Sequence, residues 1–219
     1  MPDFDGAPGR IPYTDLPFNE RDSSRSYAAV VQEHEIDFMG LVGDRLARFG
    51  ACALLDMACG NSTFAAEIGR QHPDALLTRA DLYTDKERGY DASNDPPNVT
   101  FLQGDCDSAL DLPDQSFDLI VTTWGPAKYD FGSTDPDHSY ITEMARLLKP
   151  GGQGFSRPEG KLFAHGFDAI ISSPKYPEHT MRKARHYKRI TEQGFRVFFH
   201  EDPNCARIYA PNETQLKVV

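Results

Sequence analysis

The chain has 219 residues, enough for one domain with a substantial core, and its hydrophobic fraction of 39% is ordinary for a globular protein. Its formal net charge of −10 disfavours a nucleic-acid partner, because such binding depends largely on Lys and Arg neutralising phosphates. No apolar run approaches the roughly 20 residues that cross a membrane. Residues 1–10 also lack the pattern of a signal peptide, so we expect a cytoplasmic protein without membrane partners.

The cysteines are scattered along the chain and indicate reduced thiols. No two of them form a Cys-x-x-Cys pair, which is the spacing typical of many zinc and redox sites. Single scattered cysteines fit a cytosolic protein better than a disulfide framework. The sequence therefore predicts no metal site. The cysteines are Cys52, Cys59, Cys106 and Cys205.

The N-terminal part of the chain divides into an arm and a helical region. Residues 1–25 are rich in proline and show little periodic apolarity, which predicts an extended or mobile arm. Residues 26–49 repeat apolar side chains at spacings near three and four, which predicts helix. Gly40 and Gly43 are expected to break this helix in two. We expect it to act as a lid or cap within a single domain of residues 26–219.

Four buried strands are expected in the first half of the domain. Each is a short apolar run, and three of them end in or near a carboxylate, at Asp56, Asp81 and Asp105. A helix is expected at residues 62–71, whereas residues 84–98 carry too many breaking residues for a regular helix. The expected strands are residues 51–55, 76–80, 99–103 and 117–123.

The second half continues the alternation but contains one irregular segment. Apolar spacing over residues 140–148 predicts a helix that stops at a Lys-Pro-Gly-Gly sequence. Residues 153–160 look loop-like, so the next strand is expected only at residues 161–164. The elements expected after it are a helix at residues 178–193 and strands at residues 195–199 and 206–209.

Strands that alternate with helices predict an α/β fold in which a mostly parallel, doubly wound sheet is covered on both faces. About seven strands are expected, with an antiparallel last hairpin strand. Ligands of such sheets bind in a crevice beyond the carboxyl ends of the strands. Asp56, Asp81 and Asp105 should therefore converge on one crevice. Asp118, at the start of a strand, should lie away from it and serve a structural role.

Residues 54–62, which read Leu-Leu-Asp-Met-Ala-Cys-Gly-Asn-Ser, resemble the first motif of class I S-adenosylmethionine (SAM)-dependent methyltransferases. The resemblance continues in order through Asp81 and through residues 104–106, 112–120 and 146–152. The first motif alone is a weak signal, but five motifs in order and at family-like spacing are a strong one. The resemblance implies a three-layer, Rossmann-like fold with SAM as cofactor.

The resemblance also implies roles for particular residues. Asp81, which follows Gly60 by 21 residues, suits a bidentate grip on the two ribose hydroxyls. The position of Asp56 usually serves the ammonium group of SAM, often through water, and that of Asp105 binds the adenine amino group. The full set of expected cofactor-binding residues is Asp56, Ala58, Gly60, Ser62, Asp81, Leu82, Asp105, Cys106 and Thr123.

The chain departs from the family pattern in the first loop. Ala58 and Ser62 replace two of three glycines; Ser62 would strain a turn that requires positive φ, or would cap the next helix. A dinucleotide-binding loop is disfavoured, because the next glycine, Gly69, comes too late for a Gly-x-Gly-x-x-Gly motif. Ser62 and residues 153–160 also leave open a SAM-binding regulator or partner subunit without transfer activity. Another alternative is aminopropyl transfer from decarboxylated SAM, suggested by Asp130, Asp135 and Asp137.

We expect methyl transfer to a small-molecule acceptor, with S-adenosylhomocysteine as product. The basic stretch over residues 182–189 is expected to form a solvated outer helix face rather than a polyanion site. A protein acceptor stays open, whereas the acidic chain disfavours nucleic acid. His165 and His138 are the candidate general bases, and His34 is a further candidate. The acceptor should sit above the ends of the fourth and fifth strands, roofed by residues 10–49.

Overall fold

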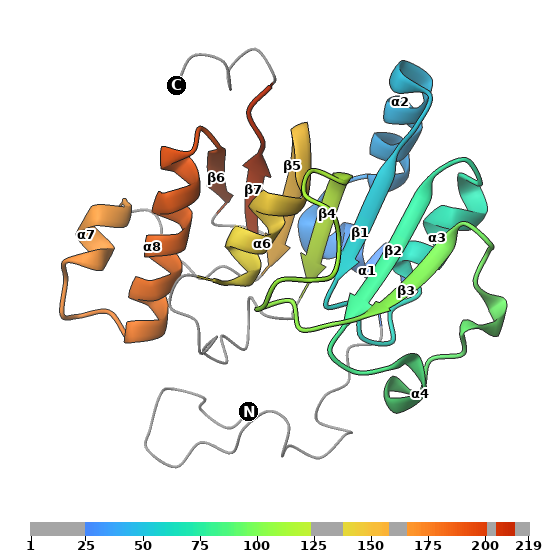
Figure 1. Ribbon diagram of the computed structural model, residues 1–219, viewed down its shortest axis with the longest axis horizontal. Helices are drawn as coiled ribbons and strands as arrows, with labels where there is room; N and C mark the ends of the chain where they lie inside the picture. Colours follow the sequence, from blue (N-terminus) through green and yellow to red (C-terminus); the bar gives the residue numbers. More distant parts are fainter. Residues whose placement is uncertain (1–24, 124–137, 158–165, 201–204, 213–219) are drawn as a thin grey trace.

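A computed structural model describes residues 25–123, 138–157, 166–200 and 205–212 (Figure 1). Seven strands form one sheet in the order β3-β2-β1-β4-β5-β7-β6. All pairs of neighbours are parallel except the two that contain β7. The predicted sheet, mostly parallel with an antiparallel last hairpin strand, is confirmed. The strands are β1 (Ala53–Met57), β2 (Leu76–Asp81), β3 (Val99–Gln103), β4 (Phe117–Thr123), β5 (Leu148–Arg157), β6 (Arg196–His200) and β7 (Cys205–Tyr209).

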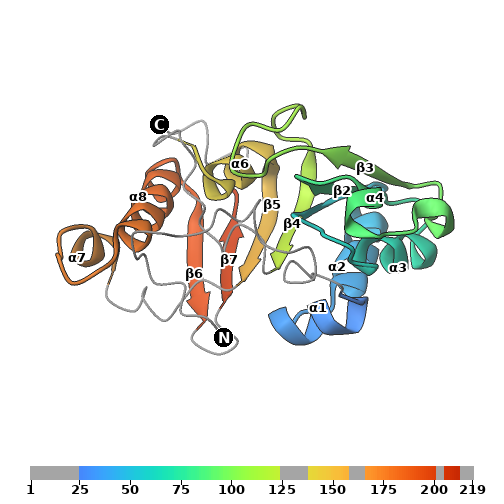
Figure 2. The same cartoon turned by 90° about the horizontal axis from the view of Figure 1, so that it is seen from below.

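Helices cover both faces of the sheet, which gives the three layers expected (Figure 2). They are α1 (Tyr27–His34), α2 (Phe38–Phe49), α3 (Phe64–Gln71), α4 (Asp85–Arg88), the 3-10 helix η3 (Ala92–Asn94), α6 (Tyr140–Leu147), α7 (Phe167–Ile171) and α8 (Glu178–Glu192). Among the described residues, no helix is both long and apolar enough to cross a bilayer.

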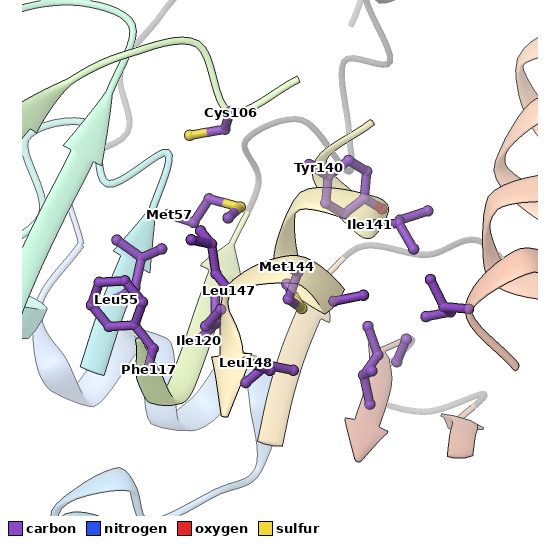
Figure 3. Packing of buried hydrophobic residues seen from close by; sticks show 14 of the residues in the cluster. Leu55, Met57, Cys106, Phe117, Ile120, Tyr140, Ile141, Met144, Leu147 and Leu148 are labelled. Atoms are coloured by element: carbon purple, nitrogen blue, oxygen red, sulfur yellow. The ribbon is translucent and has the colours of Figure 1, made fainter. Parts of the chain in front are cut away.

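Two hydrophobic clusters hold the layers together. On one face, Phe38 of α2 meets Phe64 of α3 and Phe155 of β5 edge to face, with ring centroids 5.3 and 5.1 Å apart. On the other face, α6 and α8 bury their apolar stripes against the sheet, and Met144 and Ile120 belong to this cluster (Figure 3). Such burial contributes roughly 25 cal/mol per Å² of apolar surface, and it fixes the strand ends relative to one another.

The break in the first helical region lies elsewhere than expected. Glu35 ends α1 in the left-handed conformation with φ 52°, and the Asp37 side chain then caps α2 by accepting from the Gly40 N–H at 3.0 Å. Gly40 and Gly43 sit inside α2, so the expectation that they divide the helix is wrong. The cap decides the outcome because a side-chain acceptor satisfies a helix N–H that would otherwise lack a partner.

The strand after α6 is not delayed. β5 begins directly at Leu148 and runs through the segment that looks loop-like in sequence, so the loop expected from residue 153 is wrong through Arg157. The glycines have a packing reason, because a Cβ on Gly154 would collide with the Met144 sulfur of α6. Polar and small residues therefore form a strand here because a helix packs closely on it. Residues 158–165, including the strand expected at 161–164, lie outside the described residues.

The segment between β2 and β3 is irregular, as expected. It holds the single-turn helix α4, which lies beyond the carboxyl end of β2, and then η3 (Figure 1). The fully buried Arg79 of β2 anchors it through Asp85, at 2.9 Å, and Asp95, at 3.3 Å. The Tyr90 ring stacks on the same guanidinium, 3.5 Å from ring centroid to Cζ. Ion pairs and a cation–π contact thus replace helix packing in this segment.

Candidate functional site

Parallel pairing places the carboxyl ends of β1 and β2 side by side. Met57 is in register with Ala80, so Asp56 and Asp81 occupy the ends of adjacent strands. The Cys59 N–H donates to the Ala80 carbonyl oxygen at 3.0 Å and ties the loop after β1 to β2. This edge of the sheet is where open α/β folds bind ligands.

Asp56 is buried and carries an oxygen without a partner. Its exposed fraction is 6%, and within the described structure Oδ2 has no hydrogen-bond partner. Burial raises the pKa of Asp56 to about 7; Arg25 and Arg79 lower it, and the neighbouring Asp81 raises it. A buried carboxylate oxygen without a donor is costly unless a ligand supplies one. Asp56 is therefore an available acceptor for a cationic group.

Asp81 is equally buried, but its oxygens already accept hydrogen bonds. Oδ2 accepts from the Gly60 N–H at 2.9 Å, and Oδ1 accepts from the Tyr83 N–H at 3.0 Å. Arg88 of α4 donates to Oδ1 from both Nε, at 3.0 Å, and a terminal nitrogen, at 2.7 Å. The carboxylate expected to grip ribose hydroxyls thus has a buried guanidinium against it.

The loop after β1 turns through two left-handed residues. Ala58 and Gly60 both have φ of 58°, whereas Ser62 is not among the residues with positive φ. The Ser62 hydroxyl donates to the Arg25 carbonyl oxygen at 2.8 Å and accepts from the Phe64 N–H at 3.2 Å, where α3 begins. The strain considered for Ser62 therefore falls on Ala58, where a side chain disfavours the left-handed region. Ser62 instead supports the start of α3.

Two buried thiols flank this loop. The Cys59 sulfur lies 3.5 Å from the Gly60 carbonyl oxygen as a donor, and Cys106 follows β3. Burial raises the pKa of both thiols, so both are neutral at physiological pH. They fill space beside the loop and are poor nucleophiles.

The other residues expected at the cofactor's adenosine end are more open. Leu82 is exposed, and its carbonyl oxygen accepts from a glutamine side chain of β3 at 3.2 Å. Asp105 is exposed as well, and its carboxylate accepts from the Asp107 N–H at 2.9 Å within the turn after β3. Both lie beyond strands β2 and β3, on the same edge as Asp81. Their binding roles stay predictions.

Thr123, at the end of β4, contacts the first helix rather than the loop after β1. His34 Nε2 lies 2.8 Å from the Thr123 hydroxyl, and the buried imidazole packs edge-on against Phe38. Burial lowers the pKa of His34 to about 3, and the positive charge of Arg157 lowers it further, so the ring is neutral. Glu33 also pairs with Arg157 at 2.7 Å. The end of α1 is thereby fixed at the carboxyl ends of β4 and β5.

Of the two histidines expected as bases, the structure describes His138. His165 lies outside the described residues, as do residues 1–24, Asp130, Asp135 and Asp137. His138 precedes α6, and its Nε2 lies 3.4 Å from the buried Glu143 carboxylate. It lines a groove of about 500 Å³ between α6 and α8, together with Arg146 and Arg189. In the described part of the chain no three metal-ligating side chains converge.

Asp118 has the structural role expected of it. Its carboxylate accepts from the Ala53 N–H at 2.9 Å, from Arg45 at 3.2 Å and from Lys149 at 2.7 Å. These contacts join the beginnings of β1 and β4 to α2 and β5, at the edge opposite Asp56.

Sequence reasoning missed Arg88, and a usable signal was present. Thr84 and Glu87 form a reciprocal capping box, and Gly89 ends the turn with φ 69°. A Thr-x-x-Glu pattern followed by glycine marks a helix start and stop, even for a helix of one turn. What the pattern does not reveal is that the last residue of that turn points back to Asp81.

Residues 54–152 match the family described as "Methyltransferase domain". These residues, a little under half of the chain, form a class I methyltransferase domain. A curated relative, the ubiquinone/menaquinone biosynthesis C-methyltransferase UbiE of Pseudoalteromonas translucida (strain TAC 125), is 36% identical over 75 residues. The alignment covers 32% of this chain and 28% of that enzyme, so the chain spans little more than a quarter of its relative's length.

Two solved methyltransferase structures align with most of the chain. The antibiotic-resistance methyltransferase Kmr aligns with a TM-score of 0.50 and 16% identity, over 80% of this chain and 93% of that one. A TehB-like SAM-dependent methyltransferase from Corynebacterium glutamicum ATCC 13032 Kitasato aligns with a TM-score of 0.49 and 15% identity, over 81% and 89%. The first likeness supports the fold alone.

SAM is the cofactor of this family, and the residues after β1 and β2 suit it. The unpartnered Asp56 oxygen matches a cationic ammonium group, and the turn at Ala58 and Gly60 brings backbone close to the same place. Asp81 has the right location and charge for ribose hydroxyls. We call Asp56, residues 58–62 and Asp81 the donor site.

Proposed function

We propose that this chain transfers the methyl group of SAM to a small-molecule acceptor and releases S-adenosylhomocysteine. The observation that carries the proposal is the donor site itself. It combines a buried, unpartnered carboxylate, a left-handed turn and a second buried carboxylate within a methyltransferase domain. SAM supplies a methyl group already activated on its sulfonium. The main task of the chain is therefore to bind SAM and to place the acceptor in line with the methyl group.

Each part of the donor site has a binding role in this proposal. Asp56 binds the ammonium group, because its Oδ2 is buried and receives no hydrogen bond from the residues that the structure describes. Asp81 binds the ribose hydroxyls. The backbone of residues 58–62 approaches the methionine portion, and the absent side chain of Gly60 leaves room for it. Asp105, Leu82 and Cys106 are proposed to border the adenine.

The acceptor is proposed to sit at the carboxyl ends of β4 and β5. The end of α1 lies there, held by the His34–Thr123 hydrogen bond and the Glu33–Arg157 ion pair. Helix α1 thus supports the proposed cap, whereas α2 packs Phe38 into the core on the sheet face. Placement of two reactants at about 3–3.5 Å can supply roughly 7–11 kcal/mol of a barrier.

Charge supports a small molecule over a nucleic acid. Two cations on the basic face of α8 have acidic neighbours: Arg185 pairs with Glu178 at 2.7 Å, and Lys188 pairs with Asp168 at 2.7 Å. Helix α8 also lies at the opposite end of the sheet from β1 and β2 (Figure 1). Acidic partners at these two positions reduce the attraction that a polyanion would feel there.

The curated relative points the same way for the acceptor. Its name assigns it to quinone biosynthesis, where the methylated compound is a small molecule. The aligned stretch is short, so it supports the acceptor class and no particular acceptor.

The four free cysteines, all buried, agree with the proposed cytoplasmic location.

The first test is SAM turnover with fractionated small metabolites, random-sequence RNA and duplex DNA offered in parallel. Release of S-adenosylhomocysteine with the small metabolites alone is the expected result, and the Asp81→Ala variant, which should bind SAM more weakly, is the control for reduced turnover. Salt-sensitive micromolar binding of RNA or DNA, with methyl incorporation into the polymer, would contradict the small-molecule acceptor. SAM binding without turnover on any acceptor would favour a regulator, and turnover of decarboxylated SAM would favour aminopropyl transfer.

A general base is needed only if the acceptor is protonated at the working pH. We retain His165 and His138 as the proposed bases, without a metal. The double variant His138→Ala, His165→Ala should then lose activity between pH 6 and 9 while SAM affinity stays the same. Full activity of that variant would remove both residues from the mechanism, and loss of activity on chelation would overturn the proposed metal-free reaction.

A further inference from the structure

The carboxylate of Asp81 has no room on Oδ1 for a ligand. An ionised carboxylate offers about four lone-pair positions, two on each oxygen. Oδ1 already receives three donors, the Tyr83 N–H and two nitrogens of Arg88, while Oδ2 receives only the Gly60 N–H. A bidentate grip on two ribose hydroxyls needs one position on each oxygen. In the described arrangement only Oδ2 has a position left.

We propose that Arg88 competes with the ribose of SAM for Asp81 and so sets the affinity of the donor site. The inference rests on the proposed function, in which Asp81 binds the ribose. Of the three residues that donate to Asp81 in the described structure, Arg88 donates from its side chain, whereas Gly60 and Tyr83 donate from their backbone N–H groups. Ligand binding therefore displaces Arg88 first.

The displacement requires a side-chain movement rather than a movement of the whole segment. Arg79 holds Asp85, at the start of α4, and Asp95, beyond η3, so the segment is anchored on both sides of Arg88. Arg88 itself is the last residue of α4 and is followed by the left-handed Gly89. Its guanidinium also faces the Tyr83 ring, 4.7 Å from the centroid. Rotation of Arg88 away from Asp81 leaves the two ion pairs of Arg79 intact.

The competition acts alike on SAM and on S-adenosylhomocysteine, because both carry the same ribose. When only a fraction of the protein is competent to bind, the apparent dissociation constant rises by the inverse of that fraction. Arg88 therefore weakens the hold on substrate and product to the same degree. A weaker hold on the product favours turnover where product release is slow.

The test compares Arg88→Met with the wild type by calorimetry, with SAM and S-adenosylhomocysteine as separate titrants. Methionine keeps an apolar stem but cannot donate to Asp81. We expect both ligands to bind about tenfold tighter, which corresponds to a paired state that is roughly ten times more populated than the free one. Lys86→Met is the matched control, because Lys86 is an exposed cation on the same helix. Its affinities should stay within about twofold of the wild type.

Unchanged or weaker binding by folded Arg88→Met would overturn the proposal, since it would mean that Arg88 is neutral or supports the ribose. If thermal melting shows that this variant is unfolded, Arg88→Lys decides instead. Lysine keeps the charge but loses the two-nitrogen contact, so binding should tighten by a smaller factor, and no tightening overturns the proposal. Asp81→Asn separates the two hypotheses: if it binds SAM as well as the wild type does, the proposed function of Asp81 fails. If Asp81→Asn binds SAM more weakly while the Arg88 variants bind it like the wild type, Asp81 keeps its proposed role and only the competition by Arg88 fails.

Discussion

The ends of β1 and β2 each carry a buried aspartate, but the two carboxylates differ in their hydrogen bonding. Asp56 is buried without a hydrogen bond to Oδ2, whereas Asp81, one strand away, accepts hydrogen bonds from three residues. Two similarly buried carboxylates thus differ in whether their oxygens are available to accept hydrogen bonds from a ligand. In the proposed function Asp56 receives a cation from the ligand, while Asp81 already pairs with Arg88, which we propose the ligand replaces. A buried carboxylate at a strand end is informative only together with its donors.

The largest effect is expected from removing the satisfied carboxylate. Asp81→Ala should weaken SAM roughly ten- to several-hundred-fold, because hydrogen bonds to a charged acceptor contribute about 1.5–3 kcal/mol each and about 1.4 kcal/mol is tenfold. Calorimetry measures the affinity. The variant also leaves buried Arg88 without its carboxylate, so a thermal melt must accompany the titration. Wild-type affinity in a folded variant would remove Asp81 from the donor site.

The next effect concerns the unsatisfied carboxylate and depends on pH. A pKa of about 7 means that Asp56 is partly protonated at neutral pH, and binding of an ammonium group favours its ionised form. SAM affinity should therefore rise by up to about tenfold per pH unit from pH 5.5 to 7 and level off above. Asp56→Asn is the control and should bind weakly with no such slope. A flat profile for the wild type would show that Asp56 does not bind a cation.

The same pKa shift has a consequence for the stability of the ligand-free protein. The folded pKa of Asp56 is raised above the ordinary 3.8, so the folded state holds a proton that the unfolded chain has released. The contribution of this group to the free energy of unfolding is full below about pH 4 and is lost as the pH rises to about 7. Denaturant melts of wild type and Asp56→Asn should diverge across this window, with the variant gaining at high pH. Parallel pH profiles would contradict the raised pKa.

The smallest effect lies in the loop that separates the two carboxylates. Ala58→Gly should raise the free energy of unfolding by about 0.5 kcal/mol, because relief of a left-handed alanine slightly outweighs the greater freedom of glycine in the unfolded chain. Ala65→Gly, a buried change inside α3, is the matched control and should destabilise. Urea melts measure both. Destabilisation by both changes would indicate that the Ala58 methyl group matters more than its backbone.

Much of the framework could be predicted from the sequence, because buried strands and their turns leave local patterns. The apolar runs that end at Asp56 and Asp81 located β1 and β2, and the sequence also located the helix that became α8. Segments whose structure depends on a distant partner were harder. β5 looked like a loop because Gly154 accommodates Met144, which no local pattern shows. The contact of Arg88 with Asp81 likewise arises from how a one-turn helix folds back on its strand.

The two buried thiols beside the donor site give it a built-in reporter. Cys59 and Cys106 are buried, so an alkylating reagent cannot reach their sulfur atoms in the folded protein. Burial also raises the pKa of each thiol, so the reactive thiolate does not form there. Alkylation of the native protein must wait for local opening of the loop after β1 or the turn after β3. The alkylation rate of these two cysteines is therefore a clock for such openings. Cys205 is buried in β7 at the other end of the sheet, so its alkylation rate measures openings there separately.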